Sequence, residues 1–263
     1  MTASPTAASA AHLDHVIFYG GYEMDSLFDF FERVGFLLTP LSRHSTGTIN
    51  RLAMLDNQYI EMIGFLPGTP KDVRPEIQVM PLGLNGVAVA DVLGSPRRTH
   101  SMAFAEPLLL ERPVKTPEVQ GIAKFLITHV ERTVPDARAF LCRHNTPELV
   151  WVKAWMQHRN TAASIAEVHI PTAYGPGFKA VMDSVFDVPD DATNVARPTY
   201  AVQQSIIHVV PCASRSLLDI RVRDLSQAQR AVQESGLTHT AEPGQITVPM
   251  PQQFHADLVF RAL

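Results

Sequence analysis

The fold is decided by the opening stretch LDHVIFYGG, residues 13–21, and by the hydrophobic pattern that follows it. Its β-branched and aromatic residues predict a strand that two glycines end. Residues 24–34 carry apolar side chains at helical spacing and stop before Gly35, which predicts a helix with one buried face. Three further strands are predicted at 36–41, 48–55 and 58–65, so the unit reads βαβββ.

The same pattern recurs in looser form, with strand openings near residues 13, 84, 165 and 217. In the second unit, residues 91–105 are broken by Gly94 and Pro96 and leave room for a short helix at most. The remaining predictions are strands at 84–90, 106–112, 122–131, 137–143, 165–170, 204–210, 217–222, 246–248 and 256–261, and helices at 176–185 and 225–235.

Each predicted helix is followed by several strands in hairpin order, whereas a parallel doubly wound fold alternates helices and strands one for one. The sequence therefore predicts an α+β fold of tandem βαβββ modules, with curved mixed sheets and helices outside. We expect a frayed tail at 1–11, an N-terminal domain of two modules at 12–162 and a C-terminal domain of two shorter modules at 163–263.

Composition excludes several classes of function. The 263 residues carry a net charge of −4, without a stripe of Lys and Arg, so neither nucleic acid nor an anionic membrane is an expected partner. No apolar run approaches the roughly 20 residues that span a bilayer. Phosphate-binding glycine motifs and the Gly-x-Ser-x-Gly elbow are absent. Two cysteines indicate a reducing compartment, and we expect a soluble, cytoplasmic protein.

Several short motifs resemble a known superfamily. The segments 13–16, 32–36 and 58–63 look like the first βαβββ module of the vicinal-oxygen-chelate superfamily. A second set of motifs resembles the narrower glyoxalase-like domain family (the glyoxalase, bleomycin-resistance and dioxygenase type). These motifs are Gly35-Phe36, Leu38-Thr39-Pro40, Arg43-His44, Gly47-Thr48, Asn50, 146–151 and 158–160. The resemblance covers most of residues 12–170. It implies paired modules that form half-open barrels, with a divalent metal in the cleft and a small substrate that chelates it through vicinal oxygens.

The resemblance also implies metal ligands. His15 and Glu61 match the family's ligand positions on the first and last strands of a module. The second module has Gly86 at the first-strand position, and glycine cannot ligate through a side chain. His144, at the end of its last strand, would complete a site of two histidines and one carboxylate. Such a site suits Fe, Mn, Ni or Zn. The alternative is a hydrogen-bonded core histidine at His15, a solvated Glu61 and a loop histidine at His144.

Other polar residues are candidates for substrate binding or proton transfer. His44, Glu61 or His158 could act as a proton shuttle. A substrate's anionic or carbonyl group could be bound by Arg43, Asn50, Arg51 and Asn160, since arginine donors form a planar fork. The alternative for these residues is stabilisation of loops through bonds to the backbone.

The C-terminal half is not expected to hold a second metal. Its first-strand equivalents of His15 are Glu167 and Asp219, and neither is a histidine. His169 is nearby, but we expect it on the face opposite to Glu167. This half is expected to complete the scaffold.

The function that these observations favour is a metal-dependent enzyme of lyase, isomerase or dioxygenase type that acts on a small molecule. Two alternatives remain: a non-catalytic, resistance-type protein that sequesters a small molecule, and a metal-free structural remnant. Gly86 stands at a position where a ligand would be expected, and this favours both alternatives. A homodimer is an open alternative to a single chain.

Overall fold

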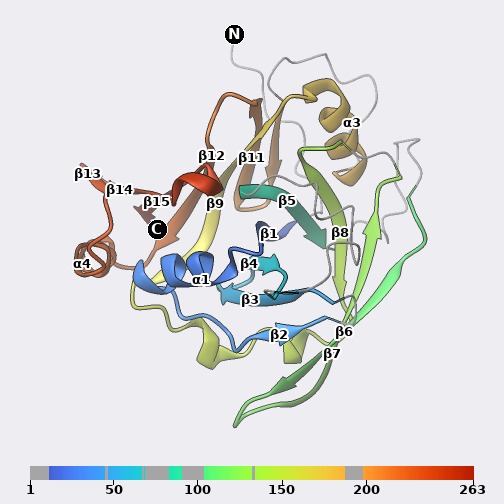
Figure 1. Ribbon diagram of the computed structural model, residues 1–263, viewed down its shortest axis with the longest axis horizontal. Coiled ribbons are helices and arrows are strands. Elements are labelled where there is room, and N and C mark those ends of the chain that lie inside the picture. The colour runs from blue at the N-terminus through green and yellow to red at the C-terminus, as the bar shows by residue number, and fades with distance from the viewer. Residues whose placement is uncertain are drawn as a thin grey trace.

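The computed structural model describes residues 12–44, 47–66, 68, 83–90, 104–131, 134–186 and 198–263, arranged as two mixed β-sheets with helices outside (Figure 1). The predicted tail at 1–11 and nearly all of the segment 91–105 lie outside these residues. Three α-helices are described: α1 (Met24–Arg33), α3 (Gly175–Val185) and α4 (Leu225–Glu234). The predicted α+β class with curved mixed sheets is confirmed.

The first sheet has eight strands in the order β2-β3-β4-β1-β5-β8-β7-β6. At its centre β1 pairs antiparallel with β5, and each of the two pairs in parallel with the last strand of its own unit, β4 or β8. The strands are β1 (His12–Gly21), β2 (Ser42–Arg43), β3 (Ile49–Met54), β4 (Tyr59–Gly64), β5 (Gly83–Ala90), β6 (Leu108–Lys115), β7 (Gln120–His129) and β8 (Arg138–His144).

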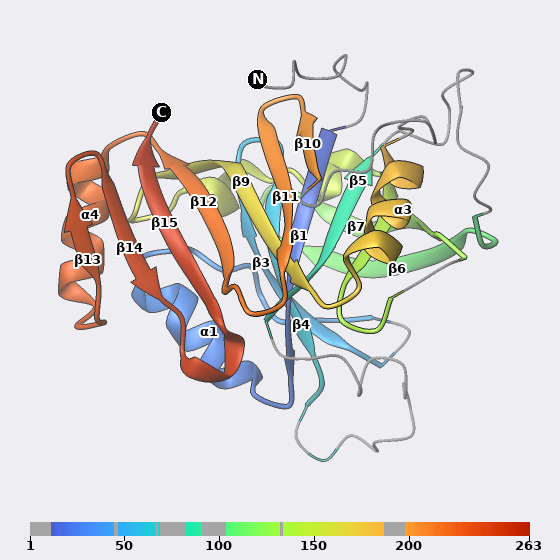
Figure 2. The ribbon, with the colours of Figure 1, turned by 90° about the horizontal axis from the view of Figure 1, so that it is seen from above.

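The second sheet repeats this plan with seven strands in the order β10-β11-β9-β12-β15-β14-β13. Its central strands β9 and β12 are antiparallel, and β11 and β15 run parallel to them. Figure 2 shows this sheet, in yellow to red, lying over β1 and β4. The strands are β9 (Ala162–Thr172), β10 (Thr199–Val202), β11 (Ser205–Pro211), β12 (Ser216–Val222), β13 (Thr240–Glu242), β14 (Gln245–Pro249) and β15 (Ala256–Ala262).

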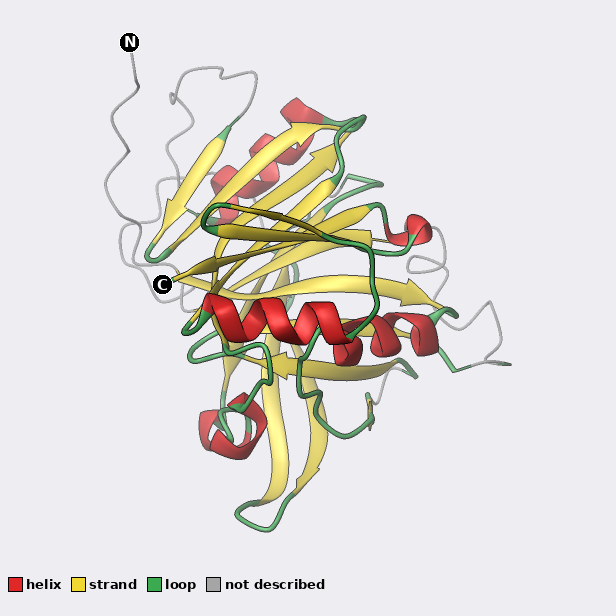
Figure 3. Cartoon of the chain, turned by 90° about the vertical axis from the view of Figure 1, so that its left-hand side faces the viewer, coloured by secondary structure: helices red, strands yellow, loops and turns green. Residues whose placement is uncertain are grey.

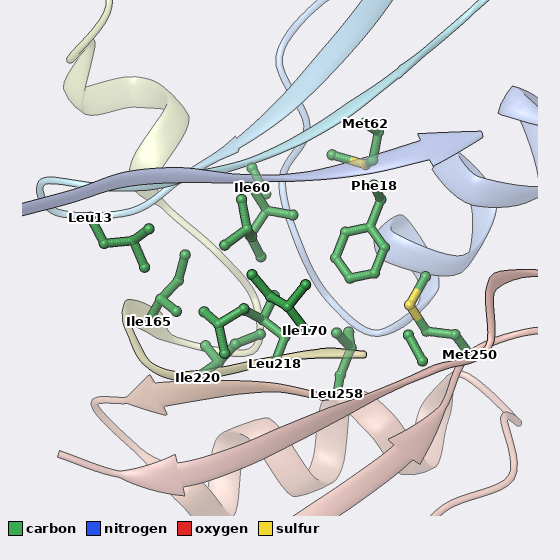
Figure 4. Close-up of a cluster of buried hydrophobic side chains, with 14 of the residues drawn as sticks. Leu13, Phe18, Ile60, Met62, Ile165, Ile170, Leu218, Ile220, Met250 and Leu258 are labelled. Carbon is green, nitrogen blue, oxygen red and sulfur yellow. The ribbon is translucent and has the colours of Figure 1, made fainter. Parts of the chain in front are cut away.

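The main core lies between the two sheets, as Figure 4 shows. Phe18 and Ile60 project from the first sheet and are fully buried, and Leu218 and Ile220 meet them from the second. Burying a side chain of this size stabilises the fold by about 1.5–3 kcal/mol. Each sheet therefore has one face in the core and the other face turned away from it.

The helices lie outside the strands (Figure 3). Helix α1 forms because its apolar residues recur on one face, and Leu27, Phe30 and Phe31 bury that face. It ends before Gly35, whose φ of 97° is a left-handed conformation that glycine adopts without strain. Among the described residues, no helix is both long enough and apolar enough to cross a membrane.

The strand predicted at 36–41 is not formed, and a two-residue strand, β2, occurs at 42–43 instead. The apolar pattern that suggested a strand has another cause: Phe36 and Leu38 point into the core. Thr39 makes two hydrogen bonds to β3 in place of regular strand pairing. Its backbone N–H donates to the Leu52 carbonyl, and its hydroxyl accepts from the Leu52 N–H. The short strands β10 and β13 were not predicted.

Candidate functional site

The face of the eight-stranded sheet opposite the core surrounds a cavity that is partly open to solvent. Its lining residues alternate along the strands with core residues: Ile17 lies in the cavity, whereas Val16 and Phe18 lie in the core. The apolar wall consists mainly of Ile17, Leu52, Ile63, Leu108, Leu110, Phe125, Ile127 and Phe140. The polar groups include His15, Tyr19, His44, Thr48, Asn50, Tyr59, Glu61, Arg112, His129 and Arg138.

A bulge in β1 positions the first polar pair. Leu13 lies opposite Val89 of β5 and His15 opposite Ala88, so Asp14 is an extra residue in the pairing. The side chains of Asp14 and His15, neighbours that would alternate in a regular strand, therefore meet. His15 Nδ1 lies 2.6 Å from Asp14 Oδ2.

Asp14 is completely buried and accepts from two histidines. Its second oxygen, Oδ1, lies 2.8 Å from Nε2 of His144. Burial alone would raise the pKa of Asp14, but the hydrogen bonds from His144 and His15 outweigh burial and place that pKa far below its usual value. The ionised carboxylate only accepts, so His15 Nδ1 and His144 Nε2 are both donors.

His15 presents its other nitrogen to the cavity. Its ring stacks on Tyr59 at 4.4 Å, and its Nε2 lies 3.6 Å from Oε2 of Glu61. The other oxygen of Glu61 accepts a 2.7 Å hydrogen bond from Asn50 Nδ2, and that amide also lies 3.2 Å from His44 Nε2. The structure therefore brings together four of the predicted residues: His15, Glu61, Asn50 and His44.

His144 does not lie beside Glu61. In the first unit Glu61 is opposite Ile17, and in the second Phe140 is opposite Ala88, which makes Phe140 the counterpart of Glu61. His144 is four residues further along β8. It contacts Asp14, the carboxylate that also contacts His15, and so helps to hold Asp14 beside His15. Its Nδ1 is buried without a hydrogen-bond partner among the described residues.

Another group that could hold a metal consists of Asp14, Cys142 and His144, whose ligand atoms all lie within 4.8 Å of one another. Both oxygens of Asp14 and Nε2 of His144 are already bonded within the protein, since His15 and His144 donate to Asp14. Burial and the charge of Asp14 also raise the pKa of Cys142, so the thiol stays protonated, whereas the thiolate is the metal ligand. This group is therefore a structural network.

Arg112 on β6 was missed by the sequence analysis. Its side chain is 3% exposed, lies over the Phe125 ring and lines the cavity, and its Nε and Nη2 have no hydrogen-bond partner among the described residues. Burial lowers its pKa, and the electrostatic interactions with Tyr59 and Glu61 oppose that shift. Strand parity was an available signal, because Leu108, Leu110 and Arg112 alternate along one face.

Four other predicted residues do not line the cavity. Arg43 is exposed on β2. Arg51 points to the other face of β3, where it pairs with Glu32 of α1 at 2.7 Å. Asn160 bonds the Val34 carbonyl and the Ala162 N–H. The bonds of Asn160, and the bond from Arg51 Nε to the Thr39 carbonyl, are of the backbone type that the loop-stabilising alternative describes.

His158 also serves the fold rather than the cavity. Its Nδ1 accepts from the Leu37 N–H at 3.0 Å and its Nε2 donates to the Met54 carbonyl at 2.7 Å. Both nitrogens are therefore used by the backbone, and the ring is neutral. Burial lowers its pKa to about 4.

This lowered pKa predicts a pH-dependent stability. Protonation of His158 favours the unfolded chain, so its contribution is complete above pH 6.5 and is lost as the pH falls toward 4. Between pH 7.5 and 4.5 we expect the wild type to lose about 2–3 kcal/mol more unfolding free energy than His158→Gln. Urea denaturation at the two pH values measures this difference, and equal losses would contradict the assignment.

Comparisons with known proteins identify the family and the fold. A family model described as a glyoxalase-like domain matches residues 13–176. No curated protein matches the sequence significantly. Among solved structures, a hypothetical protein from Staphylococcus aureus has a TM-score of 0.68 at 13% identity, over 96% of this chain and 100% of that one.

Two further structures share the fold at low identity. One is a xylose isomerase-like TIM barrel/4-hydroxyphenylpyruvate dioxygenase fusion protein, with a TM-score of 0.57 at 13% identity over 99% of this chain and 50% of that one. The other is a mutant of 4-hydroxymandelate synthase from Streptomyces coelicolor, with a TM-score of 0.50 at 12% identity over 96% and 93%. At these identities the similarity establishes the fold alone.

Proposed function

Since the chain belongs to the glyoxalase-like domain family, we propose that it is a metal-dependent enzyme acting on a small carboxylic acid in the cavity of the eight-stranded sheet. One observation carries the proposal. A carboxylate-supported histidine, His15, faces Glu61 in the same cavity that contains Arg112, whose buried Nε and Nη2 have no partner among the described residues. The reaction would be of lyase, isomerase or dioxygenase type.

The residues around His15 fit a divalent metal ion. Because Nδ1 of His15 is bonded to Asp14, Nε2 is the nitrogen that faces the Glu61 carboxylate, across 3.6 Å. Two electron-rich atoms at this distance are stabilised by a cation between them, and one ion with bonds of about 2.0–2.2 Å can reach both. Ligating histidines commonly donate their other N–H to a carboxylate, as His15 does to Asp14.

His15 and Glu61 would hold the ion, and two protein ligands leave positions open for substrate oxygens. The bound ion would stabilise negative charge that develops on those oxygens. Asp14 fixes the proton and the orientation of His15. Asn50 holds one oxygen of Glu61 by its 2.7 Å hydrogen bond, which leaves the other turned toward His15.

The cavity favours a substrate with an apolar body and an acidic end. Its wall includes Leu108, Leu110, Phe125 and Ile127, which suit a hydrocarbon or an aromatic ring. Arg112 offers donors suited to a carboxylate. A 2-oxo or 2-hydroxy acid with an apolar side chain combines vicinal oxygens, a carboxylate and an apolar body, so this is the substrate class that we propose.

A second candidate is a protein that binds such an acid without transforming it. The observation that favours it is the number of ligands: His144 contacts Asp14, and Phe140 occupies the position that corresponds to Glu61. A site with two protein ligands binds an ion more weakly than the three-ligand sites usual for catalytic zinc.

The test uses phenylpyruvate as the probe and calorimetry as the measurement. We expect Arg112→Leu to weaken its binding about 10–100-fold, since a hydrogen bond to a charged group contributes about 1.5–3 kcal/mol. We expect Mn²⁺ to tighten its binding to the wild type but not to Glu61→Gln. The matched control is Arg43→Leu, an exposed arginine outside the cavity, which should bind like the wild type.

Unchanged affinity in Arg112→Leu would contradict the proposal that Arg112 binds the carboxylate of the substrate. The same Mn²⁺ effect in Glu61→Gln would contradict the proposal that Glu61 holds a metal ion. Turnover separates the two functions. The wild type is incubated with a panel of 2-oxo and 2-hydroxy acids and Fe²⁺, Mn²⁺, Ni²⁺ or Zn²⁺, while oxygen uptake and loss of the acid are followed. Acids that bind and are recovered unchanged would favour the non-catalytic function.

A further inference from the structure

Three polar side chains meet on the seven-stranded sheet, on the face turned away from the core. Glu167 and His169 lie two residues apart on β9 and share this face, while Val168 between them is in the core. His208 on β11 lies directly opposite His169. The expectation that His169 and Glu167 point to opposite faces was wrong, because alternate residues of a strand share a face.

The ligand atoms of these three residues converge. One oxygen of Glu167, Oε2, lies 3.6 Å from Nε2 of His169 and 3.8 Å from Nε2 of His208. All three ligand atoms lie within 4.8 Å of one another. Both separations are longer than a hydrogen bond, and His169 Nε2 is buried with no hydrogen-bond partner among the described residues. The fold thus brings three good ligands together without using them on one another.

The protonation and orientation of His208 suit ligation. Thr199 on β10 places its hydroxyl 3.1 Å from His208 Nδ1, which leaves Nε2 directed toward Glu167. Burial and the neighbouring His169 lower the pKa of His208, which favours the neutral ring. Neutral imidazole is the form that binds metals.

The site is open to solvent, and a further carboxylate lies beside it. The side chains of Glu167, His169 and His208 are each about 30% exposed, so an ion can enter and keep water ligands. Asp219 on β12 lies opposite Glu167 and is fully buried, with one oxygen bound by Arg261 and the other lacking a partner among the described residues.

We propose that Glu167, His169 and His208 bind a divalent transition-metal ion of the Zn²⁺ type, at a site separate from the cavity of the eight-stranded sheet. Two histidines and one carboxylate are a common ligand set for such ions. The ion would link β9 to β11. It would therefore stabilise this side of the sheet, whether or not the other cavity is occupied.

The experiment removes the first site before it tests the second. The tag-free double variant His15→Ala/Glu61→Gln, stripped with chelator and dialysed, is titrated with Zn²⁺ by calorimetry. We expect one ion per chain. Adding His208→Ala should weaken binding by about 100-fold or more, because loss of an outer partner alone costs about 10–100-fold. Adding Glu167→Gln, which preserves shape, should weaken it in the same direction.

The control is His239→Ala, which removes a histidine whose Nδ1 lies against the Leu237 carbonyl, away from the cluster. It should leave Zn²⁺ binding unchanged. Thermal unfolding gives a second readout: saturating Zn²⁺ should raise the Tm of the double variant and not that of the variant that also lacks His208. Absence of Zn²⁺ binding in the double variant, or binding that survives His208→Ala and Glu167→Gln, would overturn the proposal. Neither result bears on the first cavity.

Discussion

Asp14→Ala is expected to lower the free energy of unfolding by about 2–6 kcal/mol, because it leaves the N–H donors of two buried histidines without an acceptor, at about 1–3 kcal/mol for each donor. Here two partners lose their acceptor at once. His15 and His144 are both almost fully buried, and each gives its hydrogen bond to a different oxygen of Asp14.

Guanidinium denaturation of Asp14→Ala and Asp14→Asn measures this effect. The asparagine variant preserves shape and one acceptor, so it should lose less stability than the alanine variant. The matched control is Asp29→Ala, an exposed aspartate on α1 whose loss should change stability by about 0.5 kcal/mol or less. A loss below about 1 kcal/mol in Asp14→Ala would show that the two histidines find other partners.

Gly64→Ala is expected to destabilise the protein by about 3 kcal/mol, at the upper end of what overpacking costs. A methyl group at this position would lie 2.4 Å from the Gly21 carbonyl oxygen and 2.4 Å from Met24 Sδ. The first of these is backbone at the end of β1 and cannot move without disturbing the pairing of β1 with β4. The second is at the start of α1, so the substitution strains the strand and the helix together.

The control for this prediction is Gly175→Ala at the first residue of α3, where an added methyl group meets no heavy atom within 4 Å. Alanine there should be neutral or stabilise by up to about 1 kcal/mol, since it favours the helix. Denaturation curves of the two variants are compared directly. Equal stability of Gly64→Ala and wild type would mean that β1 and β4 can separate at no cost.

The fold was largely predictable because the strongest signals were periodic. Helix α4 was predicted at 225–235 and occurs at Leu225–Glu234, since its apolar residues recur on one face. The segment 36–41 misled the prediction, because Phe36 and Leu38 are buried by the core and not by a sheet. Strand β13 was missed since its three residues are all exposed and carry no apolar alternation.

The candidate site was predictable only in part. The family resemblance pointed to His15 and Glu61, which meet in the cavity, but Asp14 could not be assigned, because a regular strand would direct it away from His15. Strand parity could have placed Arg112 on the same face as Leu108 and Leu110, but the sequence analysis did not consider it. His158 and Asn160 are polar residues in a loop, and their backbone partners near Met54 and Val34 are distant in sequence. Only tertiary structure shows such bonds.

The bulge at Asp14 also determines how this chain tolerates changes in length. It adds one residue to β1 relative to β5, between Leu13 and His15. Deleting or inserting a single residue here would exchange the two faces of the strand beyond the change. Val16 and Phe18 would then point toward the cavity and not into the core. The rest of the strand therefore accepts substitutions more readily than insertions or deletions. Natural and designed variants of this strand should differ in residue type while keeping its length.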